Sequence, residues 1–180
     1  QNTAGKLTVT SEDASFGGGQ AQLNLTLDTS KEEPDLDLTF GIDQIAYGDL
    51  REEMSGEAAE IHGSADFTLN ATSTGQTYEA LLQNMSGQAK FLSGQGRLQS
   101  NVIDRWGGGL FGMLVPDFDQ DKELEMNCAV MQAPIENGVA KVETLFLETK
   151  RATVVGDGDY NIAEDDLDIK LKPDSKGIVL

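Results

Sequence analysis

Hydrophobic and polar residues alternate with a period of two along most of this 180-residue chain. In the first half, Leu23, Leu25 and Leu27 are separated by polar residues at positions 22, 24, 26 and 28. Because successive side chains of a β-strand point to opposite faces, this spacing predicts a strand with one buried face. The same alternation predicts strands at residues 6–10, 35–40, 65–70, 89–92 and 96–99.

The longest series of alternations runs from Cys128 to Pro173. Within it, Asn137-Gly138 lies between two apolar-periodic runs, and this dipeptide is typical of a tight β-hairpin turn. The segment therefore predicts an antiparallel ladder with one apolar face and one charged or polar face. The apolar face of the ladder consists of Leu145, Leu147, Leu167, Ile169 and Leu171.

Three segments depart from the period of two. In residues 42–55 the apolar residues fall three or four apart, which places them on one face of a helix. Residues 77–85 contain good helix formers after Thr77, a favourable N-cap residue. Residues 102–114 are a third helical candidate, interrupted by three glycines. The pattern predicts a mainly β fold with two or three short helices, in a single domain over residues 1–180.

The charge of the chain limits its partners. It has 13 basic and 31 acidic residues, for a net charge of −18, which repels nucleic acid and anionic lipid headgroups. No apolar run is long enough to span a bilayer. The single cysteine, Cys128, excludes an internal disulfide, and its apolar neighbours predict a buried position.

No motif in the chain predicts catalysis or a cofactor. Residues 157–168 resemble a calcium-binding loop, but Ile162 stands where that loop needs glycine and Asp168 where it needs glutamate. His62 is the only histidine, so the chain cannot form a multi-histidine metal site by itself. We therefore expect no enzyme activity, no cofactor and no tightly bound metal; saturable, tight calcium binding in calorimetry would contradict the last expectation.

The order and spacing of glycines and apolar residues in the C-terminal ladder form an extended pattern. Its segments are Cys128-Ala129-Val130, Ile135-x-Asn137-Gly138-Val139, Leu145-x-Leu147-x-Thr149, Val154-x-Gly156-x-Gly158 and Leu167-Asp168-x-x-Leu171-x-Pro173-x-x-Lys176. This pattern resembles the C-terminal domain of the AsmA family of bacterial envelope proteins. Residues 75–98 resemble that family's helix and strand–turn–strand element, so the resemblance covers roughly residues 36–176. Ala133-Pro134 and the glycines at 107–109 depart from the family pattern.

The resemblance implies a curved antiparallel sheet with an apolar inner groove, in the periplasmic portion of a bacterial inner-membrane protein. It implies a non-enzymatic role in outer-membrane assembly and in phospholipid transport between the inner and outer membranes, with phospholipid and other envelope proteins as partners. Members usually begin with a membrane anchor. Together with the strand-like start and apolar end of the chain, this predicts a fragment of a longer membrane-anchored protein.

Two interpretations of the apolar face remain open at this stage. In the first, the face is open and holds lipid. In the second, the short helices cover the face as an ordinary core, and the chain is a structural or protein-interaction β domain of the periplasm without lipid carriage. The candidate residues for either role are Leu23, Leu25, Leu27, Leu145, Leu147, Leu167, Ile169 and Leu171.

Overall fold

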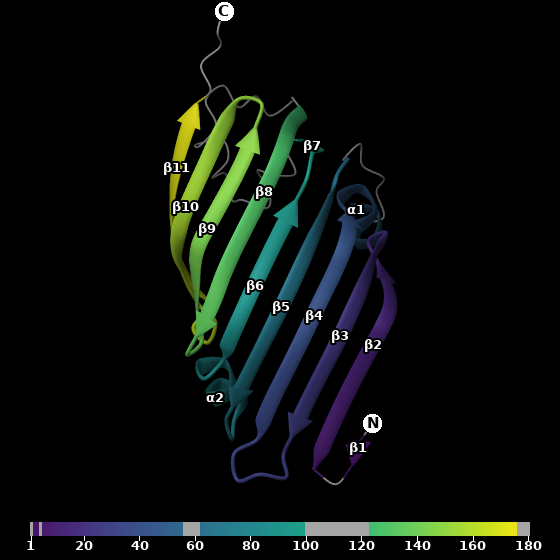
Figure 1. Cartoon of the computed structure of the whole chain (residues 1–180), viewed down its shortest axis with the longest axis vertical. Helices are drawn as coiled ribbons and strands as arrows, with labels where there is room; N and C mark the ends of the chain where they lie inside the picture. Colours follow the sequence, from purple (N-terminus) through teal and green to yellow (C-terminus); the bar gives the residue numbers. More distant parts are fainter. Residues whose placement is uncertain (1, 4, 56–61, 100–122, 176–180) are drawn as a thin grey trace, which may run out of the picture.

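The computed structural model describes residues 2–3, 5–55, 62–99 and 123–175. These residues form one open antiparallel sheet of eleven strands and two short helices (Figure 1). The mainly β, antiparallel fold predicted from the alternation is therefore confirmed. The helix predicted at residues 102–114 lies outside the described residues. The elements are β1 Asn2–Thr3, β2 Lys6–Phe16, β3 Gly19–Asp28, β4 Asp35–Ala46, α1 Tyr47–Ser55, β5 Ser64–Thr74, α2 Tyr78–Gln83, β6 Ser86–Ser93, β7 Gly96–Gln99, β8 Glu123–Glu136, β9 Val139–Thr149, β10 Ala152–Asn161 and β11 Asp166–Ser175.

The strands follow one another in the sheet in nearly the same order as in the sequence. The path runs β1-β2-β3-β4-β5-β6-β8-β9-β10-β11, and β7 pairs with the first part of β8 while β6 pairs with the rest. The predicted turn at Asn137-Gly138 joins β8 to β9, with φ of 50° and 74° at its two residues. Positive φ at both central positions is the requirement of a type I′ hairpin, which explains the choice of asparagine and glycine.

The registers of neighbouring strands align their apolar positions into continuous rows. Directly opposite residues of an antiparallel pair project from the same face of the sheet. Following these pairs from strand to strand gives a row that crosses from β2 to β11 and contains only apolar residues and one glycine. Its members are Val9, Leu25, Leu38, Ala71, Gly87, Ile135, Ala140, Tyr160 and Leu167.

Bulges preserve this alignment where the sequence period changes. In β4, Ile42 lies opposite Phe67 and Ile45 opposite Ala65, so β4 has one extra residue between two pairs, and Gln44 there has φ of 56°. An extra residue returns both isoleucines to the same face of the sheet. The helix predicted at residues 42–55 is therefore wrong over residues 42–46, which belong to β4, and correct over α1. The spacing of three between Ile42 and Ile45 reflects a bulge.

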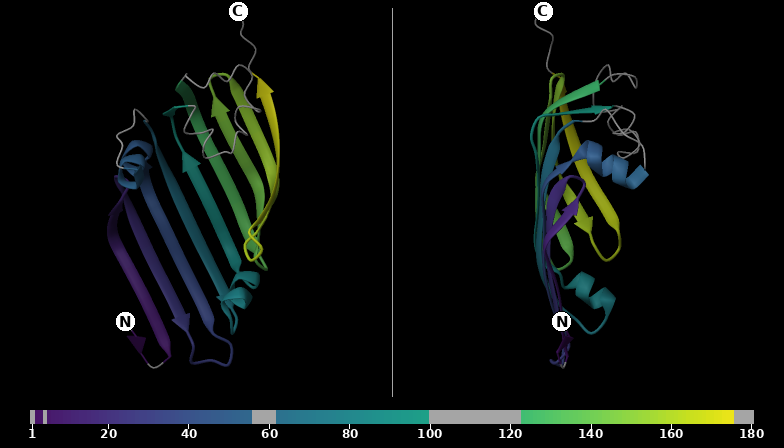
Figure 2. Two further views of the ribbon diagram at one scale, coloured as in Figure 1. Left: turned by 180° about the vertical axis from the view of Figure 1, so that it is seen from behind. Right: turned by 90° about the vertical axis from the view of Figure 1, so that its right-hand side faces the viewer.

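Both helices lie on the same side of the sheet, near opposite ends of its strands, and β10 and β11 bend toward that side (Figure 2). The helix predicted after Thr77 is confirmed as α2, and the Thr77 side chain accepts a hydrogen bond from the N–H of Ala80 at 3.1 Å. The main hydrophobic core lies between α2 and the sheet, around Met85, Ile135 and Val142. The side that carries the helices is thus the apolar side.

Candidate functional site

The candidate site is the apolar side of the sheet, which we call the inner face. All eight residues predicted from the sequence to share an apolar face lie on it, because the strand registers connect them through opposed pairs. Leu145 and Leu171 approach each other over Gly156: a Cβ atom at Gly156 would lie 2.6 Å from a Leu145 methyl and 2.7 Å from a Leu171 methyl. The glycine of the Val154-x-Gly156-x-Gly158 pattern thus leaves room for these two leucines.

The predicted residues form two separate groups on this face. Leu23, Leu25 and Leu27 lie on β3, whereas the others lie on β9 and β11 at the far side of the sheet. Leu25 and Leu167 belong to the same row but are separated by seven strand intervals, or about 34 Å at the usual strand spacing. Between these two groups the row passes through Ala71, Ile135 and Ala140, which are buried, so a ligand on the open part of the inner face contacts the β3 group and not the β9 and β11 group.

One part of the inner face is covered. Met85, Ala133, Ile135 and Val142 are buried, and Leu82 of α2 packs against them. Leu145 and Ile169 also pack against this cluster. In this part of the sheet, the interpretation of the apolar face as an ordinary core is correct.

Hydrogen bonds to main-chain carbonyl groups hold α2 on the inner face. The Gly138 N–H donates to the carbonyl of Met85 at 2.8 Å, and the Ile162 N–H donates to the carbonyl of Gly138 at 2.9 Å. The Ser73 hydroxyl donates to the carbonyl of Leu81 at 2.5 Å. These bonds connect α2 to the β8–β9 turn and to β5, so the helix is part of the folded sheet.

Another part of the inner face is exposed. Leu7 and Val9 on β2 are 42% and 41% exposed, and Leu167 on β11 is 60% exposed. The leucines of β3 are half-buried, as are Leu36, Leu38 and Phe40 of β4. Neither α1 nor α2 lies over the central parts of β2, β3 and β4 (Figure 2). Among the described elements, this region of the inner face is open.

At the other end of the strands, α1 packs near the β2–β3 turn. The Gly17 N–H donates to the Glu53 carboxylate at 2.9 Å. The Tyr47 hydroxyl donates to Ser93 at 2.5 Å, and Ser93 is 1% exposed. Burial raises the pKa of Tyr47, with a smaller opposing effect from Ser93. The two helices therefore border the open region at its two ends.

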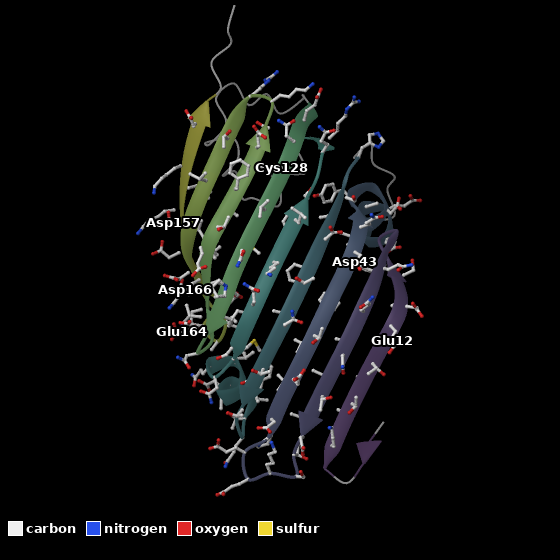
Figure 3. The ribbon with its side chains drawn as sticks, viewed as in Figure 1. Glu12, Asp43, Cys128, Asp157, Glu164 and Asp166 are labelled. Carbon is white, nitrogen blue, oxygen red and sulfur yellow. The ribbon has the colours of Figure 1, made fainter. Side chains whose placement is uncertain are left out.

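The opposite side, which we call the outer face, is rich in carboxylates and also carries an apolar row, Leu92, Val130, Phe146 and Val155, in which Leu92 is 51% and Val155 44% exposed. Figure 3 shows acidic side chains on strands from β2 to β11, including Glu12, Asp43, Asp157 and Asp166. Lys172 lies 3.5 Å from Asp157 on this face. Such a surface keeps an open sheet soluble while the other face remains apolar.

Cys128 also belongs to the outer face, opposite Glu148 of β9. It is a free, half-buried thiol on the side away from the core, so the prediction that it is buried in the core is wrong. A bulge at the start of β8, between Met126 and Cys128, changes the face: Met126 is 4% exposed on the inner side. The apolar neighbours of Cys128 could not reveal this shift, because a bulge depends on the pairing partner.

The calcium-like segment is part of two paired strands. Asp159 lies directly opposite Asp168 on the outer face, and the described residues contain no group of three or more metal-binding side chains arranged around one point. The pKa of Asp28, at the end of β3, lies below its ordinary value because its carboxylate accepts hydrogen bonds from the hydroxyl and main-chain N–H of Ser30, at 2.6 and 2.9 Å. These carboxylates belong to strand faces and turns exposed to solvent.

Several residues of the open region were absent from the predicted set, although the sequence contained the signal for them. Leu7 and Val9, and Leu36, Leu38 and Phe40, alternate with polar residues in the same way as the leucines of β3. The registers then place them beside Leu23, Leu25 and Leu27. The arrangement offers a broad apolar surface suited to binding aliphatic chains. No helix among the described residues is long and apolar enough to cross a membrane.

Comparison with known proteins gives consistent results. The model of the AsmA family matches residues 2–145, so the match begins nearer the N-terminus than the resemblance seen in the sequence and ends before β10 and β11. The chain is also similar to the AsmA family protein YhjG of Escherichia coli strain K12, with 32% identity over 126 residues. This alignment covers 70% of the chain and 17% of the relative's length. No solved structure matches the chain.

Proposed function

Because this chain belongs to the AsmA family, we propose that its inner face shields the acyl chains of phospholipids in the bacterial envelope. In this proposal the chain acts by binding, without catalysis, in outer-membrane assembly and in phospholipid transport between the inner and outer membranes. It lies in the periplasm as part of a longer inner-membrane protein. The family membership supports the envelope role, and the geometry of the inner face supports the lipid.

The observation that carries the proposal is the continuous apolar row from Val9 to Leu167, part of which is open. Each methylene group that leaves water for an apolar surface gains about 0.8 kcal/mol. The open part of the row consists of Val9, Leu25 and Leu38 on β2, β3 and β4, so an acyl chain lying along it would contact three strands at once. A compact polar ligand would gain nothing from this surface.

The charge of the outer face supports the same interpretation. Its carboxylates repel anionic headgroups, so adsorption of intact membranes to that face is disfavoured. The open apolar surface of β2, β3 and β4 lies on the inner face, and we infer that single lipid molecules bind there, with their headgroups toward solvent at the rim of the sheet.

Site-specific photocrosslinking tests the proposal. A photoreactive amino acid at Leu25 probes the open part of the inner face, and the same group at Asn24 is the matched control, because the adjacent residue of β3 faces the opposite side. The two proteins are expressed in a bacterial host, irradiated and analysed by mass spectrometry for covalently attached phospholipid. We expect adducts at Leu25 and few or none at Asn24; a probe at Ile169, beside the covered cluster, should give an intermediate yield.

Equal yields at Leu25 and Asn24 would contradict binding on the inner face. If neither the irradiated nor the unirradiated protein carries phospholipid, the alternative function is favoured: a structural or protein-interaction β domain of the periplasm without lipid carriage. The cover that α2 provides over Ile135 and Val142 is the observation on which that alternative rests.

A further inference from the structure

The strand β11 forms one edge of the sheet and, among the described residues, pairs only with β10 (Figure 1). An edge strand presents main-chain N–H and C=O groups that a further strand can pair with. Leu167 of this strand is 60% exposed, so the edge also presents apolar surface to solvent. A surface of this kind fits an extended strand as its partner.

The start of β11 has a self-complementary charge pattern. It reads Asp-Leu-Asp-Ile-Lys-Leu-Lys, so the aspartates precede the central Ile169 and the lysines follow it. If two copies of this segment run antiparallel with Ile169 opposite itself, each Asp168 faces Lys170 of the other copy. Each Asp166 likewise faces Lys172. Opposite charges at directly opposed positions stabilise an antiparallel pair.

The apolar residues match in the same register. Leu167 of one copy faces Leu171 of the other, and the two Ile169 residues face each other. Because the apolar positions of both copies are then on the same side, the two inner faces become parts of one continuous surface. The exposed Leu167 gains an aliphatic neighbour from the second copy.

Registers shifted by two residues do not place opposite charges at every charged position. Moving one copy by two residues in either direction places lysine opposite lysine or aspartate opposite aspartate, and like charges at opposed positions are destabilising. The seven-residue segment carries two acids and two bases and is locally neutral, in a chain with a net charge of −18. Screening limits charge interactions to about 8 Å at physiological ionic strength, so the charges that act at this edge are those of the segment itself and of Asp157 and Asp159, which lie opposite it on β10.

The neighbouring strand supports the same partner. Asp168 lies directly opposite Asp159 of β10, a pairing of like charges within the chain. Lys141 of β9 lies opposite Asp159 on its other side, whereas Lys170 of a second copy would lie opposite Asp168 in the self-complementary register.

We propose that two copies of this chain associate through β11, antiparallel and centred on Ile169, to form one continuous sheet. Such a pairing adds roughly six to eight main-chain hydrogen bonds across the two-fold axis. Its contact area is small, so the dimer forms reversibly and depends on protein concentration. This inference does not depend on whether the inner face binds lipid.

A single-cysteine cross-link tests the register. In a Cys128→Ser background, Ile169→Cys places two thiols opposite each other on the two-fold axis, where Cα atoms of opposed residues lie about 4.5–5.5 Å apart, within the range of a disulfide. Leu171→Cys is the matched control: it lies on the same strand and face, but in the proposed register it faces Leu167 and is about 13 Å from its own copy. We expect a disulfide-linked dimer with Ile169→Cys at near-complete yield under mild oxidation, and none with Leu171→Cys.

Charge exchange tests the recognition. Lys170→Glu with Lys172→Glu makes the segment wholly acidic, and Asp166→Lys with Asp168→Lys makes it wholly basic. In sedimentation analysis each double variant should be monomeric, and an equimolar mixture should form a heterodimer. Lys6→Glu with Lys90→Glu, on β2 and β6, is the control with the same charge change away from β11 and should dimerise as the parent chain does.

Circular dichroism verifies that each variant is folded. A chain that stays monomeric over its full range of solubility, or equal cross-linking at positions 169 and 171, would overturn the proposal. Dimers that persist in both charge variants would also overturn it, because the association would then use another surface.

Discussion

Replacing Gly138 with alanine should weaken the attachment of α2 to the inner face. Gly138 has φ of 74°, and a Cβ atom there would lie 2.6 Å from the carbonyl oxygen of Leu82 and 2.9 Å from the Cα of Gln83. Both contacts are with the main chain of the α2 region, so a side-chain rotation cannot relieve them. The helix or the β8–β9 turn must move.

The magnitude follows from two terms. The left-handed conformation costs a residue with a side chain about 1–2 kcal/mol relative to glycine. Moving α2 away weakens the hydrogen bonds of Gly138 with Met85 and Ile162, each of which contributes about 1 kcal/mol net. We therefore expect Gly138→Ala to lower the free energy of unfolding by about 2–4 kcal/mol.

Urea denaturation followed by circular dichroism measures this difference, and Gly94→Ala is the matched control. Gly94 lies in the connection between β6 and β7, and a Cβ atom there would have no neighbour within 4 Å. Its substitution should change the free energy of unfolding by less than about 0.5 kcal/mol. If the two variants are equally stable, the reasoning about the close approach of α2 to the turn is refuted.

Two further predictions concern burial and pH. Ile135→Ala, at a site 4% exposed, should lower the free energy of unfolding in urea by about 2–5 kcal/mol. Leu167→Ala, at a site 60% exposed, should lower it by less than about 1 kcal/mol. Equal losses would show that the covered and open regions are wrongly assigned. Ser30→Ala should raise the pKa of Asp28 toward its ordinary value in an NMR titration, because the hydroxyl that bonds the carboxylate is removed. When folding lowers the pKa of a carboxyl group, that group stabilises the folded state at pH values above its unfolded-state pKa. This contribution is lost as the pH falls through the folded-state pKa. Ser30→Ala should therefore lose less stability than the parent protein on acidification below about pH 4. An unchanged pKa of Asp28 in Ser30→Ala would refute this assignment.

The open and covered parts of the inner face have different roles, one in the proposed lipid binding and the other in stability. The covered part, around Met85 and Ile135, is a conventional core that stabilises the sheet. The open part, on β2, β3 and β4, is the surface to which the proposed lipid binding belongs. Substitutions in the two parts should separate stability from lipid binding, which makes Leu25 a more informative probe than Ile169.

Much of the fold was predictable because the information is local. The alternation of Leu23, Leu25 and Leu27 identifies a strand and its apolar side from a few neighbouring residues. The Asn137-Gly138 turn and the Thr77 cap are also local, since each depends on the backbone preference of one or two residues. These predictions needed no knowledge of the rest of the chain.

The errors occurred where pairing between strands decides the outcome. Ile42 and Ile45 have helical spacing, but β5 provides a partner for both and a bulge absorbs the extra residue. Cys128 has apolar neighbours, but the bulge after Met126 places it on the outer face. A bulge is a mismatch between two strands, so one strand alone cannot reveal it.

Consecutive residues were enough to predict an antiparallel sheet with a continuous apolar face, because side-chain alternation is a property of one strand. The tertiary structure alone decided which part of the apolar face is covered. Exposure depends on what packs above a residue, and α2 covers Ile135 while Leu25, in the same row, lies beyond its reach. The surface proposed to hold lipid is therefore the part of the inner face that α2 does not cover, and the periodicity of the strands cannot predict where that part lies.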